Sequence, residues 1–237
     1  MEKKIGGLMN LNDLINIYEK WKKKYGESVY EHVSDILREA KDKHKDDWQL
    51  NRTPNGDHEQ SWRAFKGKNF EKLVLYIIKE EVEKLGLRVV DGNYLERSSG
   101  SNLSYEENKV KRNLLVDYGE FGSFLPDVDL VIYNPTEYSV VAVVSNKITL
   151  RERIAQTGYW KIKLSQDTTT SSIKVFFVTP DEDGTLTKRI PPKKGRAIVE
   201  VDTDGSYIMT DENIEESDRV KKFDKFIPDL RRLLNGN

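Results

Sequence analysis

The clearest strand pattern in the chain lies near its centre, in the stretch PDVDLVIYNPTEYSVVAVVSNK, residues 126–147. Two apolar runs flank the turn formers Asn134-Pro135-Thr136-Glu137, and this pattern predicts a strand, a turn and a second strand. The second run, Val140–Val144, is apolar at every position. It therefore belongs in the middle of a sheet that is covered on both faces.

Amphipathic stretches precede this hairpin. Apolar residues at helical spacing predict three helices, over residues 11–25, 28–45 and 61–86, and Ser61 is the expected N-cap of the third. The stretch LRVVDG, residues 87–92, predicts a short strand.

After the hairpin the pattern alternates between helix and strand. Helices are predicted over residues 150–164 and 216–234, the latter with Pro228 near its middle. A buried strand is predicted over residues 173–180, and two short strands within residues 195–210.

Two polar stretches, residues 51–60 and 96–112, are predicted to be loops. The order of the elements predicts an α/β fold with a central mixed sheet flanked by helices. We expect an N-terminal helical region over residues 1–50 and a second region over residues 51–237 that contains the sheet.

Composition narrows the classes of function. The 39 Lys and Arg residues are balanced by 40 Asp and Glu, so binding of a nucleic acid would need a local basic surface. The chain has no cysteine, which excludes disulfides and thiolate metal sites and fits a cytoplasmic location. No apolar run approaches 18 residues, so no membrane partner is expected.

Two pairs of polar residues mark the ends of the predicted hairpin strands. Asp127 and Asp129 lie two apart at the start of the first strand, and Ser145 and Lys147 lie two apart at the end of the second. Residues two apart on a strand point to the same side. Because an antiparallel hairpin brings these two ends together, one or both aspartates should lie beside Ser145 and Lys147.

Carboxylates beside a lysine suit the cleavage of a phosphodiester. Aspartate oxygens are ligands that Mg²⁺ prefers, and the bound ion polarises the phosphate and acidifies a bound water. The lysine can stabilise the attacking hydroxide or the charge that develops on the phosphate. The same spacing is also compatible with a structural salt bridge between a strand-end lysine and a neighbouring aspartate.

The order of these residues resembles a known signature. Pro126-Asp127, a hairpin and then Ser145-Asn146-Lys147 look like the PD-(D/E)XK nuclease superfamily, although most members have an acid where Ser145 stands. The serine and the run SNKITLRER, residues 145–153, are similar to a branch of type II restriction endonucleases that read CCGG- or CCNGG-like sites. The resemblance implies a sequence-specific, Mg²⁺-dependent endonuclease that cleaves double-stranded DNA. A two-fold symmetric site calls for a homodimer. Residues 1–50 would then serve dimerisation or contact with the DNA backbone, and residues 51–237 would form the catalytic and DNA-recognition domain.

The start of the helix after Lys147 carries the implied recognition residues. In that branch an arginine-acid-arginine cluster reads guanine and cytosine, which implies base contacts for Arg151, Glu152 and Arg153. The helix dipole disfavours cations in the first turn, so the two arginines there call for an anionic or guanine partner. Glu152 also completes a capping box with Thr149, which is a full structural account of that residue.

The metal site needs a second carboxylate, for which the residues leave several sources. The stretch SWRAFKGKNFEKLV resembles the first helix of the family, whose Phe-Glu carboxylate points at the metal, and here that acid is Glu71. The helix over residues 150–164 has no acid where some members carry one. The second ligand is therefore Glu71, the other member of the Asp127 and Asp129 pair, or absent. Asp129 is slightly favoured as the strand-start ligand, because Leu-Val-Ile follows it directly.

Other interpretations stay open. Lys161 and Lys163 could contact DNA phosphates, or they could be solvated surface residues. A structure-specific repair or junction nuclease of the same fold is one rival function. A DNA-binding domain without nuclease activity is another, since Ser145 replaces an acid.

Overall fold

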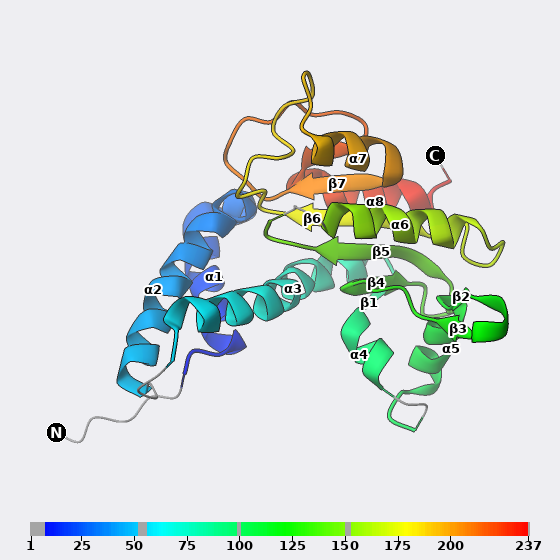
Figure 1. Ribbon diagram of the computed structural model, residues 1–237, viewed down its shortest axis with the longest axis horizontal. Helices are drawn as coiled ribbons and strands as arrows, with labels where there is room; N and C mark the ends of the chain where they lie inside the picture. Colours follow the sequence, from blue (N-terminus) through cyan, green and yellow to red (C-terminus); the bar gives the residue numbers. More distant parts are fainter. Residues whose placement is uncertain (1–7, 52–55, 99–100, 150–152, 237) are drawn as a thin grey trace.

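A six-stranded mixed sheet forms the centre of the molecule (Figure 1). The computed structural model describes residues 8–51, 56–98, 101–149 and 153–236. In spatial order the strands are β1 (Arg88–Asp91), β4 (Leu130–Tyr133), β5 (Val140–Asn146), β6 (Lys174–Thr179), β7 (Gly205–Ile208) and β8 (Val220–Lys222). Strands β1, β4 and β5 are antiparallel neighbours, whereas β5 to β8 run parallel. The predicted α/β class with a central mixed sheet is confirmed.

The predicted hairpin is confirmed as β4 and β5, in which Leu130 pairs with Val144. The side chain of Asn134 accepts hydrogen bonds from the backbone N–H groups of Thr136 and Glu137, which fixes the turn between the two strands. All of β4 and all but one residue of β5 are buried. The apolar run therefore lies in the middle of the sheet because both of its faces are covered.

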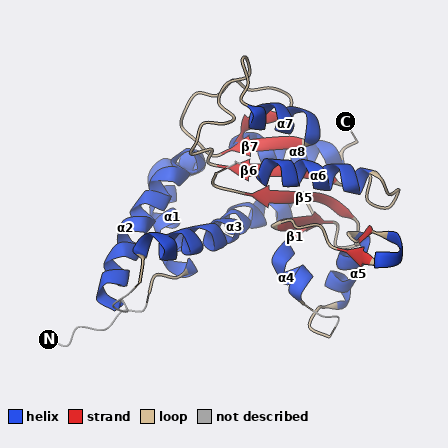
Figure 2. Cartoon of the chain, in the orientation of Figure 1, coloured by secondary structure: helices blue, strands red, loops and turns tan. Residues whose placement is uncertain are grey.

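Helices cover both faces of the sheet (Figure 2). One face packs against α3 (His58–Lys84) and α8 (Phe226–Leu234), and the helices α1 (Leu11–Tyr25) and α2 (Val33–Asn51) extend the same core. The other face packs against α4 (Gly92–Arg97), α5 (Tyr105–Asn113), α6 (Arg153–Ser165) and α7 (Lys194–Asp202). A small separate hairpin, β2 (Val116–Asp117) and β3 (Ser123–Phe124), lies before β4.

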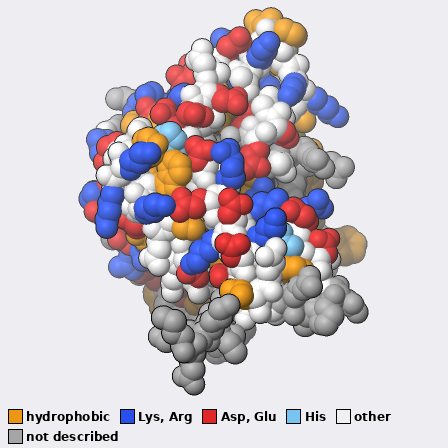
Figure 3. Space-filling view, turned by 90° about the vertical axis from the view of Figure 1, so that its left-hand side faces the viewer, with side chains coloured by type: hydrophobic (Ala, Val, Ile, Leu, Met, Phe, Trp, Pro, Cys, Tyr) orange, Lys and Arg blue, Asp and Glu red, His pale blue; other side chains and the backbone are white. Residues whose placement is uncertain are grey.

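The N-terminal helices share a core with the rest of the chain. Helices α1 and α2 both contact α3, and a short 3₁₀ helix, Gly26–His32, joins them. On the face that they form, Lys and Arg side chains are intermixed with Asp and Glu, with only small hydrophobic patches between them (Figure 3). This face therefore carries no broad field of one sign.

Four predictions about local structure are wrong, each for an identifiable reason. Helix α3 begins before Ser61, because Asp57 is the N-cap and accepts a hydrogen bond from the Glu59 N–H. Residues 96–112, predicted as a loop, contain most of α5, which starts with a capping box between Ser104 and Glu107.

The other two errors lie in the C-terminal third. The stretch predicted as two strands contains the helix α7 and the strand β7, since the buried Arg196 and Val199 lie three residues apart on one helix face. The predicted helix over residues 216–234 begins as the strand β8, and α8 starts only at Phe226. Pro228 thus falls in the first turn of α8, where its missing N–H costs no hydrogen bond.

Across the described ranges, the structure contains no helix that is long and apolar enough to cross a membrane.

Candidate active site

The hairpin brings Asp129 and Lys147 together. Asp129 directly precedes β4 and Lys147 directly follows β5, and the antiparallel register places these two ends side by side. The Lys147 Nζ lies 2.9 Å from Asp129 Oδ1, and the backbone N–H of Asn146 donates to Asp129 Oδ2 at 2.6 Å. Asp129 is 3% exposed, so both oxygens of a buried carboxylate have fixed partners.

Glu71 reaches the same lysine from α3. Its neighbours Phe70 and Leu73 are buried in the core, which turns the Glu71 side chain toward the edge of the sheet. Glu71 Oε1 lies 3.1 Å from Lys147 Nζ. One ammonium group therefore contacts carboxylates from two elements that are distant in sequence.

The cluster contains two carboxylates, Glu71 and Asp129, and one ammonium group, so it would carry a net negative charge if all three groups were ionised. Burial and the nearby Asp129 charge raise the pKa of Glu71 to about 7, although Lys147 acts in the opposite direction. A carboxylate with a raised pKa beside a charged partner in a cleft is typical of functional sites.

Asp127 is placed differently from Asp129. It is exposed, and its Oδ2 accepts a hydrogen bond from the Gln156 side chain at 2.5 Å. It lines the same cleft as Glu71, Asp129 and Lys147 but forms no ion pair with the lysine. Of the two aspartates, Asp129 is the one in the cluster.

Ser145 and Asn146 end strand β5 as buried polar residues. Ser145 is 5% exposed and precedes the cluster on the strand. Asn146 is 1% exposed, and neither polar atom of its side-chain amide has a hydrogen-bond partner in the structure as described. Sequence reasoning overlooked Asn146, although an amide at the end of an apolar strand is a visible signal.

Gly92 supports the position of Asp129 and was also overlooked. Its N–H donates to the Asp129 carbonyl at 2.8 Å, and a Cβ at this position would lie 2.0 Å from the Val128 carbonyl oxygen. Only glycine permits this approach. In the sequence, Asp91-Gly92 suggested no more than the end of a strand; in the structure Asp91 is the N-cap of α4.

The predicted recognition residues fall largely outside the described part of the chain. This holds for Arg151 and Glu152, and for the side chain of Arg153, whose backbone begins α6. Lys161 forms an ion pair with Asp204 at 2.6 Å. The Lys163 ammonium lies over the Tyr118 ring, 4.9 Å from its centroid.

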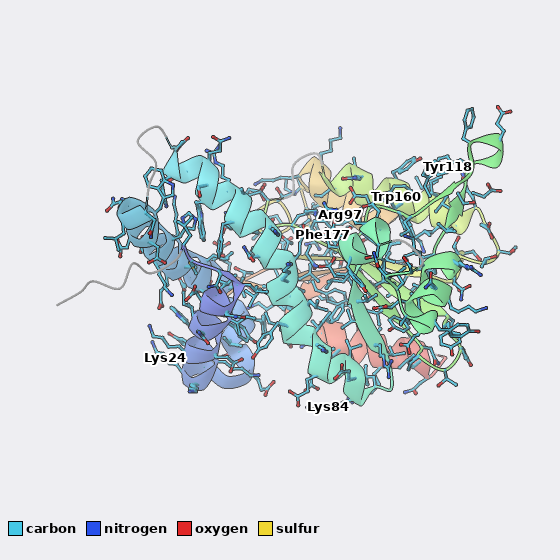
Figure 4. All side chains as sticks on the ribbon, turned by 90° about the horizontal axis from the view of Figure 1, so that it is seen from below. Lys24, Lys84, Arg97, Tyr118, Trp160 and Phe177 are labelled. Carbon is cyan, nitrogen blue, oxygen red and sulfur yellow. The ribbon has the colours of Figure 1, made fainter. Side chains whose placement is uncertain are left out.

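Two adjoining clefts meet at the cluster, since Lys68, Glu71 and Lys147 line both of them. The first, of about 680 Å³, extends along α3 toward Arg63 and past Asn146. The second, of about 640 Å³, extends past Asp129 toward Arg97 on α4. Figure 4 shows the molecule from the side on which α3 crosses its middle, with Arg97 labelled near the centre of the view.

The donors available for a metal ion are few. The described residues contain no group of three or more Asp, Glu, His or Cys side chains suited to hold a metal. Glu71 and Asp129 nevertheless offer two carboxylates that converge on one cation, the Lys147 ammonium.

Comparison with known proteins gives a consistent result. Residues 106–229 match the family model described as "BsaWI restriction endonuclease type 2". A protein of Methanocaldococcus jannaschii, assigned as the type II restriction enzyme MjaVIP, is 34% identical over 230 residues, which cover 95% of each chain. A protein of Helicobacter pylori, described as the probable type II restriction enzyme HpyAORF263P, is 35% identical over 134 residues. That match covers 56% of this chain and 67% of the relative.

Solved structures show the same fold. The restriction endonuclease PspGI, in complex with its substrate DNA, aligns with a TM-score of 0.54 at 15% sequence identity, covering 94% of this chain and 93% of that one. The matched family region includes Asp129 and Lys147 but not Glu71, which lies upstream of it.

Proposed function

The chain belongs to the BsaWI family of type II restriction endonucleases, and from that premise we propose that Glu71, Asp129 and Lys147 form its Mg²⁺-dependent cleavage centre. The observation that carries this proposal is the Lys147 ammonium, which contacts both carboxylates where two clefts meet. The Asp129 carboxylate alone already neutralises the charge of Lys147. The second carboxylate is half-buried beside the first, and its charged form is disfavoured, which points to a chemical role.

Asp129 and Glu71 are the residues that would hold the metal ion. Mg²⁺ keeps several of its waters and is usually bound by one or two carboxylates together with phosphate oxygens, so this donor set fits it. When bound, the ion polarises the scissile phosphate and lowers the pKa of a coordinated water.

The residues of the chain would divide the remaining work. The Asn146 N–H fixes the orientation of Asp129, and Lys147 stabilises negative charge on the phosphoryl oxygens. Hydrolysis joins a hydroxide oxygen to phosphorus, and the bond between phosphorus and the leaving sugar oxygen breaks. The leaving oxygen then takes up a proton.

Glu71 also argues against a domain without nuclease activity. Ser145 stands where most PD-(D/E)XK enzymes have an acid, and Glu71 supplies a carboxylate to the same lysine from α3. Asp127 is the weaker candidate for the second carboxylate, because its side chain is hydrogen-bonded to Gln156.

Sequence recognition is assigned to the start of α6. We propose that Arg151, Glu152 and Arg153 contact bases, since α6 begins just beyond the residues that line the first cleft. A two-fold symmetric site implies a homodimer, with α1 and α2 as candidates for the dimer contact or for contact with the DNA backbone. The enzyme would act in the cytoplasm.

Digestion of a DNA of known sequence, with MgCl₂ or with EDTA, tests the function. Discrete fragments with identical mapped ends are expected with Mg²⁺ only. Fragments with random ends, or cutting confined to branched DNA, would support the structure-specific rival instead.

A further inference from the structure

We propose that the exposed face of α3 around Gly67 and Lys68 seats the sugar–phosphate backbone of the strand being cut, and that Lys68 binds a phosphate next to the scissile one. This inference rests on the proposed cleavage centre and adds a positioning surface to it. The chemistry that the surface would recognise is a phosphodiester chain, whatever its base sequence.

The two clefts set the path of such a chain. Lys68 lies three residues before Glu71 on α3, so both side chains lie on the same side of the helix. Lys68, Glu71 and Lys147 are the residues that both clefts share. A strand that places a phosphate at Lys147 and continues along either cleft therefore passes Lys68.

Cations without a carboxylate partner line this path. Within the described ranges, no carboxylate oxygen lies within ion-pair distance of Arg63, Lys68, Lys72 or Arg97, which all line one or both clefts. By contrast, Lys66 on the same helix is paired with Glu182 at 3.1 Å. The first cleft is lined by Arg63, Lys66, Lys68 and Lys147 against the carboxylate of Glu71, so a polyanion that enters this cleft encounters a local excess of positive charge.

Gly67 has no structural reason to be a glycine. It lies within the helix α3, and a Cβ built on it would meet no atom within 4 Å. A glycine in an exposed helix interior weakens the helix relative to alanine. What its missing side chain does provide is a low surface beside Lys68, on which a backbone can approach the helix closely.

Asn146 is an independent indication that the first cleft receives a ligand. Its amide is buried at the end of β5, lines this cleft and lacks a hydrogen-bond partner within the described structure. Buried polar groups in native proteins are nearly always paired. An unpaired amide beside the catalytic lysine is consistent with a site that is completed by a bound group.

The test compares Lys68→Ala with Lys79→Ala. Lys79 is an exposed residue on the same helix, and its side chain lines neither cleft. Binding to a duplex that contains the mapped site is measured in EDTA over a range of NaCl concentrations. Loss of one phosphate contact should make the fall of the log binding constant with log[salt] shallower, reducing the size of the slope by about 0.9. It should also weaken binding about fivefold at 0.15 M salt. Lys79→Ala should match the wild type in both measurements.

Gly67→Ala provides the second arm. The substitution should raise the melting temperature by a few degrees through helix propensity, yet weaken duplex binding and slow single-turnover cleavage. A defect in folding could not produce both results together. Equal slopes for Lys68→Ala and Lys79→Ala, or wild-type binding by Gly67→Ala, would overturn the inference.

The test of the backbone path can fail or succeed independently of the test of the proposed cleavage centre. Binding in EDTA requires no catalysis, so the lysine comparison decides the path of the backbone by itself. If Lys147→Ala still cleaved DNA, the cleavage centre would be wrong whatever the salt slopes showed.

Discussion

The two oxygens of the Asp129 carboxylate are divided between two partners that are consecutive in sequence, since Oδ1 contacts the Lys147 ammonium and Oδ2 accepts the Asn146 N–H. The carboxylate is thereby held at the end of β5 in advance of substrate binding. Preorganisation of this kind lets a site stabilise charge without reorganising during the reaction.

Lys147→Ala should abolish cleavage while sparing site-specific binding. Loss of the ammonium removes the stabilisation of the phosphoryl charge, for which a fall of about 10³-fold in single-turnover rate is expected. Affinity for the cognate duplex should fall by no more than about fivefold, the loss expected for one phosphate contact, as measured by gel shift or fluorescence anisotropy. Cleavage at a near wild-type rate in Mg²⁺ would refute the assignment of Lys147.

Asp129→Asn and Asp127→Asn form a matched pair, with the same chemical change two residues apart. Asp129→Asn should lose cleavage to the same degree as Lys147→Ala, because the amide is a poor metal ligand and weakens the contact with the lysine. Asp127→Asn should cut within about tenfold of the wild type, since its contact is with Gln156. A reversed order of the two rates would transfer the metal-binding role to Asp127.

Glu71→Gln should separate stability from activity. Burial and Asp129 disfavour the charged form of Glu71, so the neutral amide is expected to raise the free energy of unfolding of the metal-free protein. A gain of about 1 kcal/mol at pH 8 in EDTA is expected, measured by urea denaturation, while cleavage in Mg²⁺ is lost. A variant that is less stable and still active would show that Glu71 has a purely structural role.

Gly92→Ala should distort the site through the backbone. The new methyl group would lie 2.0 Å from the Val128 carbonyl oxygen, which the backbone can relieve only by moving away from Asp129. We expect a destabilisation of about 2 kcal/mol or more together with reduced cleavage. Gly67→Ala, where nothing lies within 4 Å, serves as the control in the stability measurement only, because it is also expected to slow cleavage.

The N-terminal helices should loosen in mild acid because of His44. This side chain is 3% exposed, and burial followed by the nearby His58 lowers its pKa below the ordinary value. The folded state therefore binds fewer protons than the unfolded state as the pH falls below about 6.5, so stability decreases.

The corresponding measurement is urea denaturation at pH 7.5 and pH 5.5. The wild type should lose about 1 kcal/mol more over this range than His44→Gln, which cannot titrate. The change in each protein is measured from its own stability at pH 7.5, because the substitution itself removes the contact between His44 and His58. An identical pH response of the two proteins would mean that folding does not lower the pKa of His44.

Part of the candidate active site could be predicted from the amino-acid sequence alone. Spacing of two at each strand end places Ser145 with Lys147 and Asp127 with Asp129, and the turn residues between the strands imply that these ends meet. These are local properties of the chain, since alternation along a strand and the geometry of a tight turn depend on neighbouring residues only.

The choice between the two aspartates required the sheet itself. The register, in which Leu130 pairs with Val144, brings Asp129 level with the end of β5 and leaves Asp127 beyond it. A shift of register by two residues would have brought Asp127 level with the end of β5 instead. Both strands are apolar at consecutive positions, so the hydrophobic pattern alone does not set the register. The approach of Glu71 from α3 likewise depends on how a helix packs across the sheet.

The wrong helix and strand assignments have the same origin. The stretch with α7 is rich in the β-branched residues Ile198, Val199 and Val201, which fits a strand, but it folds as a helix around Arg196. That buried guanidinium donates to the backbone carbonyls of Leu186 and Glu215. Such contacts join segments that are distant in sequence, and they override local propensity.

The sequence by itself therefore determined the central hairpin and the residue types at its ends, because those follow from period, turn chemistry and local charge. The tertiary structure decided which carboxylates share Lys147, which glycine supports them and which cations line the clefts beside them. Those relationships depend on distances between elements that only packing sets.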